Sequence, residues 1–384
     1  MPALDLPPSL APLRPAPTRP AAPVHRPLPV LRRLPQALQN ADPSPGRSAR
    51  MLSFARTKIQ PPRPRPGQLQ PRPQLEARLA EALLSQRLVL VQAAAGYGKT
   101  SALARQVQCL PAGTALAWVS CDLGDSPPRL FQCLVSALEP YDLPWRLEPE
   151  ALMAGAAGDG TPAGRSRGLR AMVAALINAL DACEVPHGVI VVDDLHRIEH
   201  PAVYEFLDLL LERFTPRWTL TVATRHDPPI ALPRLRARGE VAEFRLEDLR
   251  FDRGEALAFG QGAGLDATTA DALFERTQGW PVALRLALHA RVGAHAVSAA
   301  PALERPMFDF LAAEVLDRLP ADLRQFLLLT SVLPELTAAR CAAVTGDAQA
   351  EGLLDRVERA GLAVSAMGGP GLSLRLHDLL REAL

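Results

Sequence analysis

One short segment of the chain combines glycines with a lysine and a threonine, a combination that is typical of phosphate binding. Residues 93–100 read AAAGYGKT, and they lie between an apolar run at 88–91 and a helical pattern that begins at Ser101. Lys99 is one of only two lysines in a chain with forty arginines. An ammonium group is a compact charge that fits beside a phosphate chain, whereas a guanidinium is broader and prefers paired acceptors. Strand, glycine loop, Lys-Thr and helix in this order predict a P-loop that binds a nucleoside triphosphate.

The P-loop assignment gives its residues separate roles. Backbone N–H groups of residues 95–99 are predicted to surround the phosphates, Lys99 to reach the β and γ oxygens, and the Thr100 hydroxyl to bind Mg²⁺. The first position of the full pattern is Ala93 instead of glycine, so a glycine-rich turn without a ligand is the alternative. The nucleotide-binding residues predicted in this segment are Ala95, Gly96, Tyr97, Gly98, Lys99, Thr100 and Ser101.

Two adjacent carboxylates end a second apolar strand. Residues 189–192 read VIVV, and Asp193 and Asp194 follow directly. Carboxylates at the end of a buried strand are costly unless a cation meets them, and the alternative is a solvated strand end. Beside a P-loop, Asp193 is predicted to hold Mg²⁺ through water, and Asp194 to orient the attacking water or act as the base. Because nucleotides bind at the carboxyl ends of parallel strands, both elements are expected in one crevice.

An arginine follows the next strand. The strand predicted at 219–223 is followed directly by Thr224 and Arg225, which therefore leave the sheet at the same edge. An arginine in this place can contact the γ-phosphate and distinguish a triphosphate from a diphosphate. It can equally be an ordinary arginine at a strand end, and the residues alone leave both interpretations open.

The elements around these residues alternate as they do in α/β proteins. Strands are predicted at 88–91, 115–120, 189–192 and 219–223, and helices at 75–85, 100–109, 128–138, 169–182 and 202–214, with a loop at 151–168. This alternation predicts an α/β P-loop NTPase fold, a parallel sheet with helices on both faces.

The strand signals stop after Phe251. Helices predicted at 254–259, 268–276, 281–291 and 308–319 indicate a small helical domain. A winged-helix domain is indicated by helices at 322–331, 338–344 and 350–360 and by strands at 362–365 and 372–376 around a glycine-rich turn at 368–371. The predicted domains are a disordered Pro/Arg-rich tail at 1–55, a P-loop nucleotide-binding domain at 56–250, a helical domain at 251–319 and a winged-helix domain at 320–384.

Composition narrows the class of protein. About half of the 38 prolines fall within residues 1–73, an arginine-rich stretch without apolar periodicity that cannot bury enough surface to become ordered. The alternatives for its first part are a nucleic-acid-binding arm and a true translation start at Met51.

Five cysteines without CxxC spacing favour reduced thiols in a cytoplasmic protein and no metal cluster. No apolar stretch approaches the ~18 residues of a membrane span, and no secretion signal opens the chain.

Eight motifs in a fixed order carry a family resemblance. They are GYGKT at 96–100, AWVSCD at 117–122, VVDDLH at 191–196, TRHDPP at 224–229, LRAR at 235–238, EDLRF at 247–251, TQGWP at 277–281 and FLLLTS at 326–331. The series resembles the MalT-like, LuxR-type ATP-dependent transcriptional regulators, large bacterial members of the STAND class of signalling NTPases. The resemblance covers roughly residues 56–384.

The resemblance implies a switch between ADP-bound and ATP-bound states. In the family, ADP holds a closed monomer, and an inducer with ATP opens the protein to self-associate and activate transcription. The resemblance makes Arg225 a sensor arginine, places Pro281 on the adenine and brings His377 to the diphosphate of the closed state. It also places Arg72 where the family's segment covers the base. From the residues alone, Pro281 is an ordinary helix start and His377 an ordinary partly buried histidine.

The departures from the family limit the expected function. The family has a superhelical sensor and a C-terminal DNA-binding helix pair, and neither lies within the 384 residues. The chain is therefore expected to be a fragment, the product of a truncated gene or a stand-alone switch, and DNA binding is not expected of it alone. Asp194, where many hydrolytic relatives have glutamate, favours slow turnover. The expected ligands are ATP or ADP with Mg²⁺, and self-association is expected in the ATP state. A stand-alone ATPase without a role in transcription and a degenerate fragment without function are the alternatives.

Overall fold

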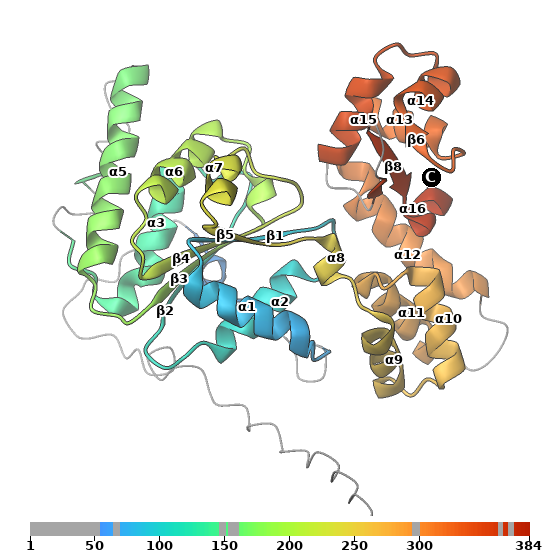
Figure 1. Cartoon of the computed structure of the whole chain (residues 1–384), viewed down its shortest axis with the longest axis horizontal. Coiled ribbons are helices and arrows are strands. Elements are labelled where there is room, and N and C mark those ends of the chain that lie inside the picture. Colours follow the sequence, from blue (N-terminus) through green and yellow to red (C-terminus); the bar gives the residue numbers. More distant parts are fainter. Residues whose placement is uncertain are drawn as a thin grey trace, which may run out of the picture.

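The computed structural model describes residues 54–63, 70–145, 151–152, 161–293, 300–359, 364–367 and 372–384. The predicted tail at 1–55, apart from its last two residues, and the predicted turn at 368–371 lie outside these ranges. The described residues form a parallel α/β sheet domain, a cluster of helices and a small domain with an antiparallel sheet (Figure 1).

The first domain is built on five parallel strands. They are β1 (Leu88–Gln92), β2 (Ala115–Ser120), β3 (Gly188–Asp193), β4 (Trp218–Thr224) and β5 (Val241–Phe244), in the spatial order β2-β3-β4-β1-β5. Register pairs Gln92 with Thr224 and Ser120 with Asp193. The carboxyl ends of the strands that carry the predicted site residues therefore lie at one edge of the sheet, as the sequence analysis expects.

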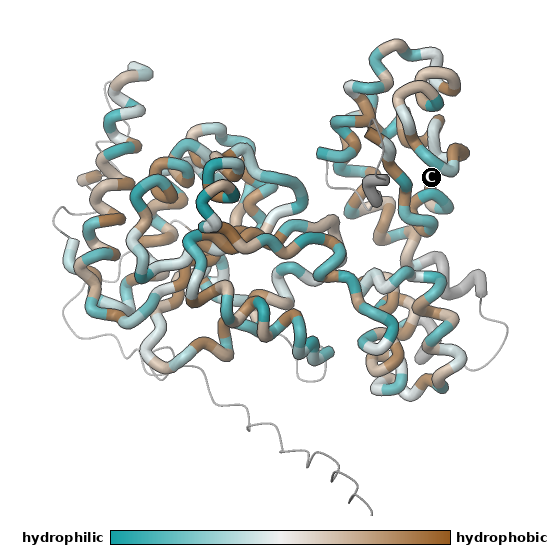
Figure 2. The backbone as a smooth tube through the Cα atoms, viewed as in Figure 1, coloured by the Kyte–Doolittle hydropathy of each residue, from teal (hydrophilic) through white to brown (hydrophobic). Residues whose placement is uncertain are grey.

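Helices cover both faces of this sheet (Figure 1). Because side chains alternate along a strand, Val89 and Val91 face α1 (Pro73–Ser85) and α2 (Lys99–Gln106), whereas Leu88 and Leu90 face the other side. That other side is covered by α3 (Pro127–Leu138), α5 (Pro162–Ala182), α6 (Pro201–Glu212) and α7 (Leu232–Ala237). Figure 2 shows hydrophobic positions concentrated along the central strands. The predicted P-loop NTPase architecture is confirmed.

The helices of the second part follow β5. They are α8 (Leu246–Leu249), α9 (Arg253–Gly262), α10 (Ala267–Thr277), α11 (Pro281–Gly293) and α12 (Ala300–Glu314), after which the 3-10 turn η6 (Leu316–Arg318) leads onward. The last part comprises α13 (Ala321–Thr330), β6 (Leu336–Thr337), α14 (Ala338–Thr345), α15 (Ala350–Arg359), β7 (Val364–Met367), β8 (Ser373–Leu376) and α16 (Asp378–Ala383). Its antiparallel sheet has the order β6-β8-β7, which completes a winged-helix arrangement.

Several elements differ from the sequence-based prediction, among them α5, β5 and α12. Residues 162–168 are helical, not loop, because Thr161 caps α5 by accepting a hydrogen bond from Gly164 N, and Pro162 suits the first helical position. Strand β5 was not predicted, since three of its four residues are only partly buried and its apolar signal is weak. Helix α12 begins at Ala300, earlier than predicted, and includes Pro306.

One hydrophobic cluster connects the domains. It runs from the α1–α2 face of the sheet through Tyr97, Trp280 and Leu311 to the winged-helix residues Phe326 and Leu376. The nucleotide-binding loop is thus part of a core shared by all three parts of the described chain. No helix among the described residues is long and apolar enough to span a membrane.

Candidate nucleotide-binding site

The predicted P-loop joins β1 to α2 at the carboxyl edge of the sheet. Its two glycines, Gly96 and Gly98, both have φ +79°, a left-handed conformation that L side chains rarely adopt. A Cβ atom on Gly96 would also lie 2.2 Å from Val282 Cγ1, so this glycine permits the close approach of α11. Gly98 is the residue before α2, whose first-turn amides therefore face the loop. Such helix starts favour anions.

Lys99 is held against the loop that precedes it. The residue is 7 % exposed, and its Nζ donates hydrogen bonds to the carbonyl oxygens of Ala93 (2.8 Å) and Ala94 (3.0 Å). Burial, with the positive charge of Arg225 as the next cause, lowers the pKa of Lys99 to about 8. Because an ammonium has three donors, one remains for an anionic ligand. A phosphate beside Lys99 would relieve the cost of burying its charge.

Thr100 and Asp193 meet beside Lys99. The Thr100 hydroxyl donates to Asp193 Oδ1 at 3.0 Å, and Asp193 is 3 % exposed. Burial, followed by the negative charge of Asp194, raises the pKa of Asp193 to about 7. No cluster of three His, Cys, Asp or Glu side chains in the described ranges could hold a metal by itself. One hydroxyl and one carboxylate fit Mg²⁺, which commonly takes its other ligands from nucleotide phosphates and water.

The raised pKa of Asp193 predicts a pH effect on the nucleotide-free protein. Between about pH 4 and pH 7 the folded state keeps a proton on Asp193 that the unfolded state has released, so the free energy of unfolding should fall as the pH rises. The steepest slope expected from one such group is about 1.4 kcal/mol per pH unit. Asp193→Asn cannot ionise and should be less sensitive to pH in this window. Urea unfolding at pH 5 and pH 7.5 in EDTA measures this difference, and parallel pH profiles for wild type and variant would contradict it.

Asp194 and His196 lie just beyond the end of β3. Asp194 has φ 57°, and its side chain is 38 % exposed, so its carboxylate is open to a ligand or water. His196 Nδ1 lies 3.9 Å from Asp194 Oδ1, and neither ring nitrogen has a hydrogen-bond partner among the described residues. Burial, then the charges of Arg225 and Lys99, lowers the pKa of His196 to about 3. The imidazole is therefore neutral, with one donor and one acceptor available.

His196 is the last residue of the VVDDLH motif at 191–196, and no role was predicted for it from the sequence. The sequence signal that could have identified His196 is its place two residues after Asp194, within the short 3-10 turn η5 (Leu195–Arg197). Unpartnered polar atoms in the interior are uncommon and point to a missing ligand or water.

Arg225 lies at the end of β4, as predicted, but contacts another domain. Its Nη1 donates to the carbonyl oxygen of Glu314 (3.0 Å), and its Nη2 donates to Glu314 Oε2 (3.1 Å). The effect of its charge on both Lys99 and His196 places the guanidinium within electrostatic reach of the loop.

Residues 280–282 cover the P-loop from the helical domain. Trp280 Nε1 donates to Ala95 O at 3.1 Å, and Val282 N donates to Gly96 O at 3.2 Å. Trp280 is 1 % exposed and stacks on Tyr97, with ring centroids 6.1 Å apart. Pro281 lies between these two contacts, at the start of α11. The helical domain therefore donates hydrogen bonds directly to the backbone of the loop.

His377 lies one ring farther from the loop. Its Nε2 is 3.1 Å from Thr277 O, and its Nδ1 accepts a hydrogen bond from Leu379 N at 3.2 Å. Burial lowers the pKa of His377, so the ring is neutral and its Nε2–H donates to Thr277. Its centroid lies 5.6 Å from that of Trp280. In this arrangement Trp280 separates His377 from the loop, and the predicted contact with a diphosphate stays a prediction.

Arg72 lies at the joint between the sheet domain and α9. Its guanidinium donates to the carbonyl oxygens of residues 248–250 and to both carboxylate oxygens of Glu255, and it stacks over the Phe251 ring. These contacts hold the start of α1 against the segment that leads into the helical domain. The predicted place of Arg72 over a nucleotide base is not tested by them.

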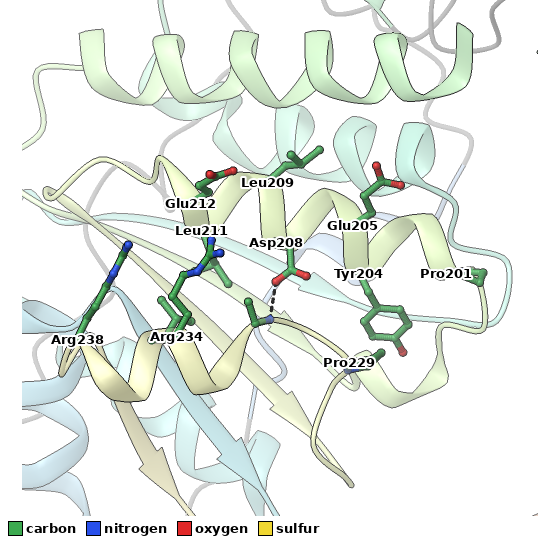
Figure 3. Close-up of a pocket in the computed structure, with 12 residues that line it drawn as sticks. Pro201, Tyr204, Glu205, Asp208, Leu209, Leu211, Glu212, Pro229, Arg234 and Arg238 are labelled. Carbon is green, nitrogen blue, oxygen red and sulfur yellow. Dashed lines mark hydrogen bonds between the residues drawn. The ribbon is translucent and has the colours of Figure 1, made fainter. Parts of the chain in front are cut away.

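A surface pocket of about 490 Å³ lies elsewhere on the sheet domain (Figure 3). Its lining includes Glu205 and Glu212 of α6, Arg234 of α7 and Arg238, which directly follows α7. Asp208 Oδ1 accepts a hydrogen bond from Ala231 N at 2.7 Å and so fixes the start of α7. None of the predicted nucleotide-site residues lines this pocket.

Two family models match the chain. A model described as an AAA domain matches residues 83–226, and one described as the MalT winged helix domain matches residues 312–384. Among solved structures, the Walker-type ATPase of Pyrococcus abyssi superposes with a TM-score of 0.55 at 12 % sequence identity, over 82 % of this chain and 95 % of that one. This likeness shows a shared fold.

Curated relatives align with most of this chain. The HTH-type transcriptional regulator MalT of Cronobacter sakazakii is 30 % identical over 310 residues, and that of Vibrio cholerae is 29 % identical over 310 residues. Each alignment covers 78 % of this chain and 33 % of the regulator, so the chain spans about a third of the length of these relatives. With the AAA-domain match and the MalT winged-helix match, these alignments make the chain similar to MalT regulators over about a third of their length.

Proposed function

We propose that this chain binds ATP and ADP with Mg²⁺ and acts as a slowly hydrolysing nucleotide switch in the control of transcription. The proposal is carried by one observation: Lys99 and the hydrogen-bonded pair Thr100 and Asp193 meet at the loop that Trp280 contacts through Ala95. The similarity to MalT regulators supports the regulatory part.

Each loop residue has a task in nucleotide binding. The amides of residues 95–101 surround the phosphates, and Lys99 keeps two bonds to the loop while its third proton reaches the β and γ oxygens. Mg²⁺, when bound with nucleotide, supplies charge neutralisation at these oxygens, and Thr100 and Asp193 would hold it. Pro281 lies at the edge of the loop, where it packs on the adenine.

Asp194 and His196 form the hydrolytic part of the proposal. The exposed carboxylate of Asp194 orients the attacking water or takes its proton. The neutral imidazole of His196, without partners among the described residues, bonds the same water or the side chain of Asp194 and fixes its direction. Arg225 is the group that contacts the γ-phosphate.

The switch is proposed to act through contacts between domains. Trp280 touches the loop through Ala95 and touches His377 of the winged-helix domain, so a change at the phosphates has a direct route to that domain. With ADP bound, His377 and Trp280 keep the parts together. With ATP bound, the parts separate and the chain self-associates.

Direct DNA binding by the winged-helix domain is not part of the proposal. Its arginines are engaged with acidic neighbours, such as Arg356 with Asp322 at 2.6 Å and Arg381 with Asp378 at 3.4 Å. Arg324, Arg340 and Arg375 also have carboxylate partners, and Arg359 donates to the Asp355 carbonyl. Nucleic-acid binding requires a basic surface. In this domain the positive charges of the arginines are largely neutralised by their acidic partners.

The nucleotide carried by the purified protein tests the proposal. Denaturation followed by chromatography should release ADP at close to one molecule per chain. No bound nucleotide, together with no binding of added ATP or ADP in the presence of magnesium, would refute the proposal and leave a fragment that only folds.

Asp194→Asn should separate binding from hydrolysis. The amide keeps the shape of the side chain but cannot act as a base, so we expect at least about a hundredfold slower hydrolysis with ATP affinity within about threefold of wild type. Single-turnover phosphate release measures the rate, and Asp122→Asn, which changes an aspartate outside the site, is the control. Equal hydrolysis rates for Asp194→Asn and wild type would remove Asp194 from the mechanism.

A further inference from the structure

Arg225 is bound by one residue of another domain. Both terminal nitrogens of its guanidinium donate to Glu314, one to the backbone carbonyl oxygen and one to the carboxylate. The Arg225 side chain is 19 % exposed and that of Glu314 is 32 % exposed, so water only partly screens the pair. Glu314, which lies 89 positions farther along the chain, therefore accepts hydrogen bonds from both terminal nitrogens of Arg225.

Glu314 lies at the joint between two domains. It is the last residue of α12, and η6 leads from it into the winged-helix domain. A carbonyl at a helix C-terminus carries partial negative charge, so the backbone and the side chain of Glu314 both attract the guanidinium. Arg318 Nη2 holds the other carboxylate oxygen at 2.7 Å. The contact thus ties the carboxyl end of β4 to the joint beyond α12.

The same guanidinium belongs to the residue after Thr224, whose carbonyl oxygen accepts a hydrogen bond from Ala93 N of the loop at 3.3 Å. After burial, its charge is the largest cause of the lowered pKa of both Lys99 and His196. A terminal phosphate beside Lys99 would carry more negative charge than one carboxylate and offer three acceptor oxygens. A two-bond contact with a phosphate would use the same terminal N–H groups that Glu314 holds. Glu314 and a terminal phosphate therefore compete for the same donors of Arg225.

We propose that Glu314 sets the preference of this chain between ATP and ADP by competing with the γ-phosphate for Arg225. With ADP, Arg225 stays on Glu314 and holds the joint to the sheet domain. With ATP, Arg225 turns to the γ-phosphate, and Glu314 is released together with η6 and the winged-helix domain. The inference rests on the proposed function, since it requires a nucleotide at Lys99. A ligand shifts such an equilibrium only by its difference in affinity for the two states, and the γ-phosphate supplies that difference.

Affinities for ADP and for a non-hydrolysable ATP analogue test the competition. Glu314→Gln keeps the size of the side chain and the backbone carbonyl but removes the negative charge. We expect the ratio of ATP-analogue affinity to ADP affinity to rise about tenfold, which corresponds to the loss of one charge-assisted contact. Calorimetric titration in the presence of magnesium measures both affinities. In an Arg225→Ala background the same substitution should leave the ratio unchanged, because the competing donor is gone.

Glu382→Gln is the matched control. Glu382 of α16 pairs with Arg276 of α10, so it also joins the winged-helix domain to the helical domain, but it does not touch Arg225. It should leave the ratio within about twofold of wild type. Three results would overturn the inference: an unchanged affinity ratio in Glu314→Gln, an equal change in Glu382→Gln, or a change that persists in the Arg225→Ala background. In each case, nucleotide binding by the wild-type chain would still support the proposed function. A wild-type chain that binds neither nucleotide would overturn both.

Discussion

Replacement of Lys99 by alanine is expected to lower the affinity for ATP and ADP at least about a hundredfold, because it removes charge-assisted bonds to two phosphate groups. The same change should not lower the stability of the nucleotide-free protein. Burial makes the charged form of Lys99 costly there, as its lowered pKa of about 8 indicates. Affinity and stability should therefore respond differently to a single substitution. Calorimetric titration with ADP and magnesium, and thermal melting without nucleotide, measure the two quantities.

Lys99→Arg is the informative companion variant. It keeps the positive charge but replaces a compact ammonium with a planar fork, which cannot reach both Ala93 O and Ala94 O from the same position. We expect it to bind nucleotide as poorly as Lys99→Ala within about a factor of ten. Micromolar binding by Lys99→Ala would refute the P-loop assignment. Full binding by Lys99→Arg would show that charge alone, and not the shape of the ammonium, matters in this loop.

The sheet could be predicted because its strands are continuous apolar runs. Strands buried on both faces, such as β3, leave an unmistakable local pattern. The edge strand β5 leaves a weak one, since Glu243 interrupts it and Val241 is only half buried. Helix α7 was missed for a similar reason, because it has only six residues, of which just Leu232 and Leu235 are buried. Burial, and not propensity, separates the predicted elements from the missed ones.

The candidate site shows the same division between local and distant information. The P-loop and Asp193 could be predicted because the residues that define each of them are adjacent in the sequence. The parallel sheet then brings the two segments together. The partners of Arg225 and His377 lie 89 and 100 residues away in the sequence, where no periodicity connects them. His196 is adjacent to the site in sequence, but its significance lies in the missing partners of its ring, which only the packing reveals.

Replacement of the other lysine, Lys58→Met, is expected to lower the free energy of unfolding by about 3 kcal/mol. Lys58 Nζ donates to Asp122 and Asp125, each at 2.7 Å, and to Ser120 O at 2.9 Å. Burial alone lowers the pKa of Lys58, but the two carboxylates outweigh it and raise the pKa, which shows a net favourable charge pairing. Without Lys58, the fully buried carboxylate of Asp125 keeps only Arg129 and one backbone amide. Urea unfolding followed by circular dichroism measures the loss.

The exposed partner of Lys58 provides the control for this prediction. Asp122 is 40 % exposed, so Asp122→Asn should cost less than about 1 kcal/mol, whereas a cost equal to that of Lys58→Met would show that burial does not decide the effect. Asp125→Asn combined with Lys58→Met should recover part of the loss, because the pair is then removed together. Ser120, whose carbonyl Lys58 also holds, is paired in register with Asp193. The two lysines therefore lie at the same edge of the sheet, Lys99 in the loop and Lys58 against the end of β2, and only replacement of Lys99 should change nucleotide affinity directly.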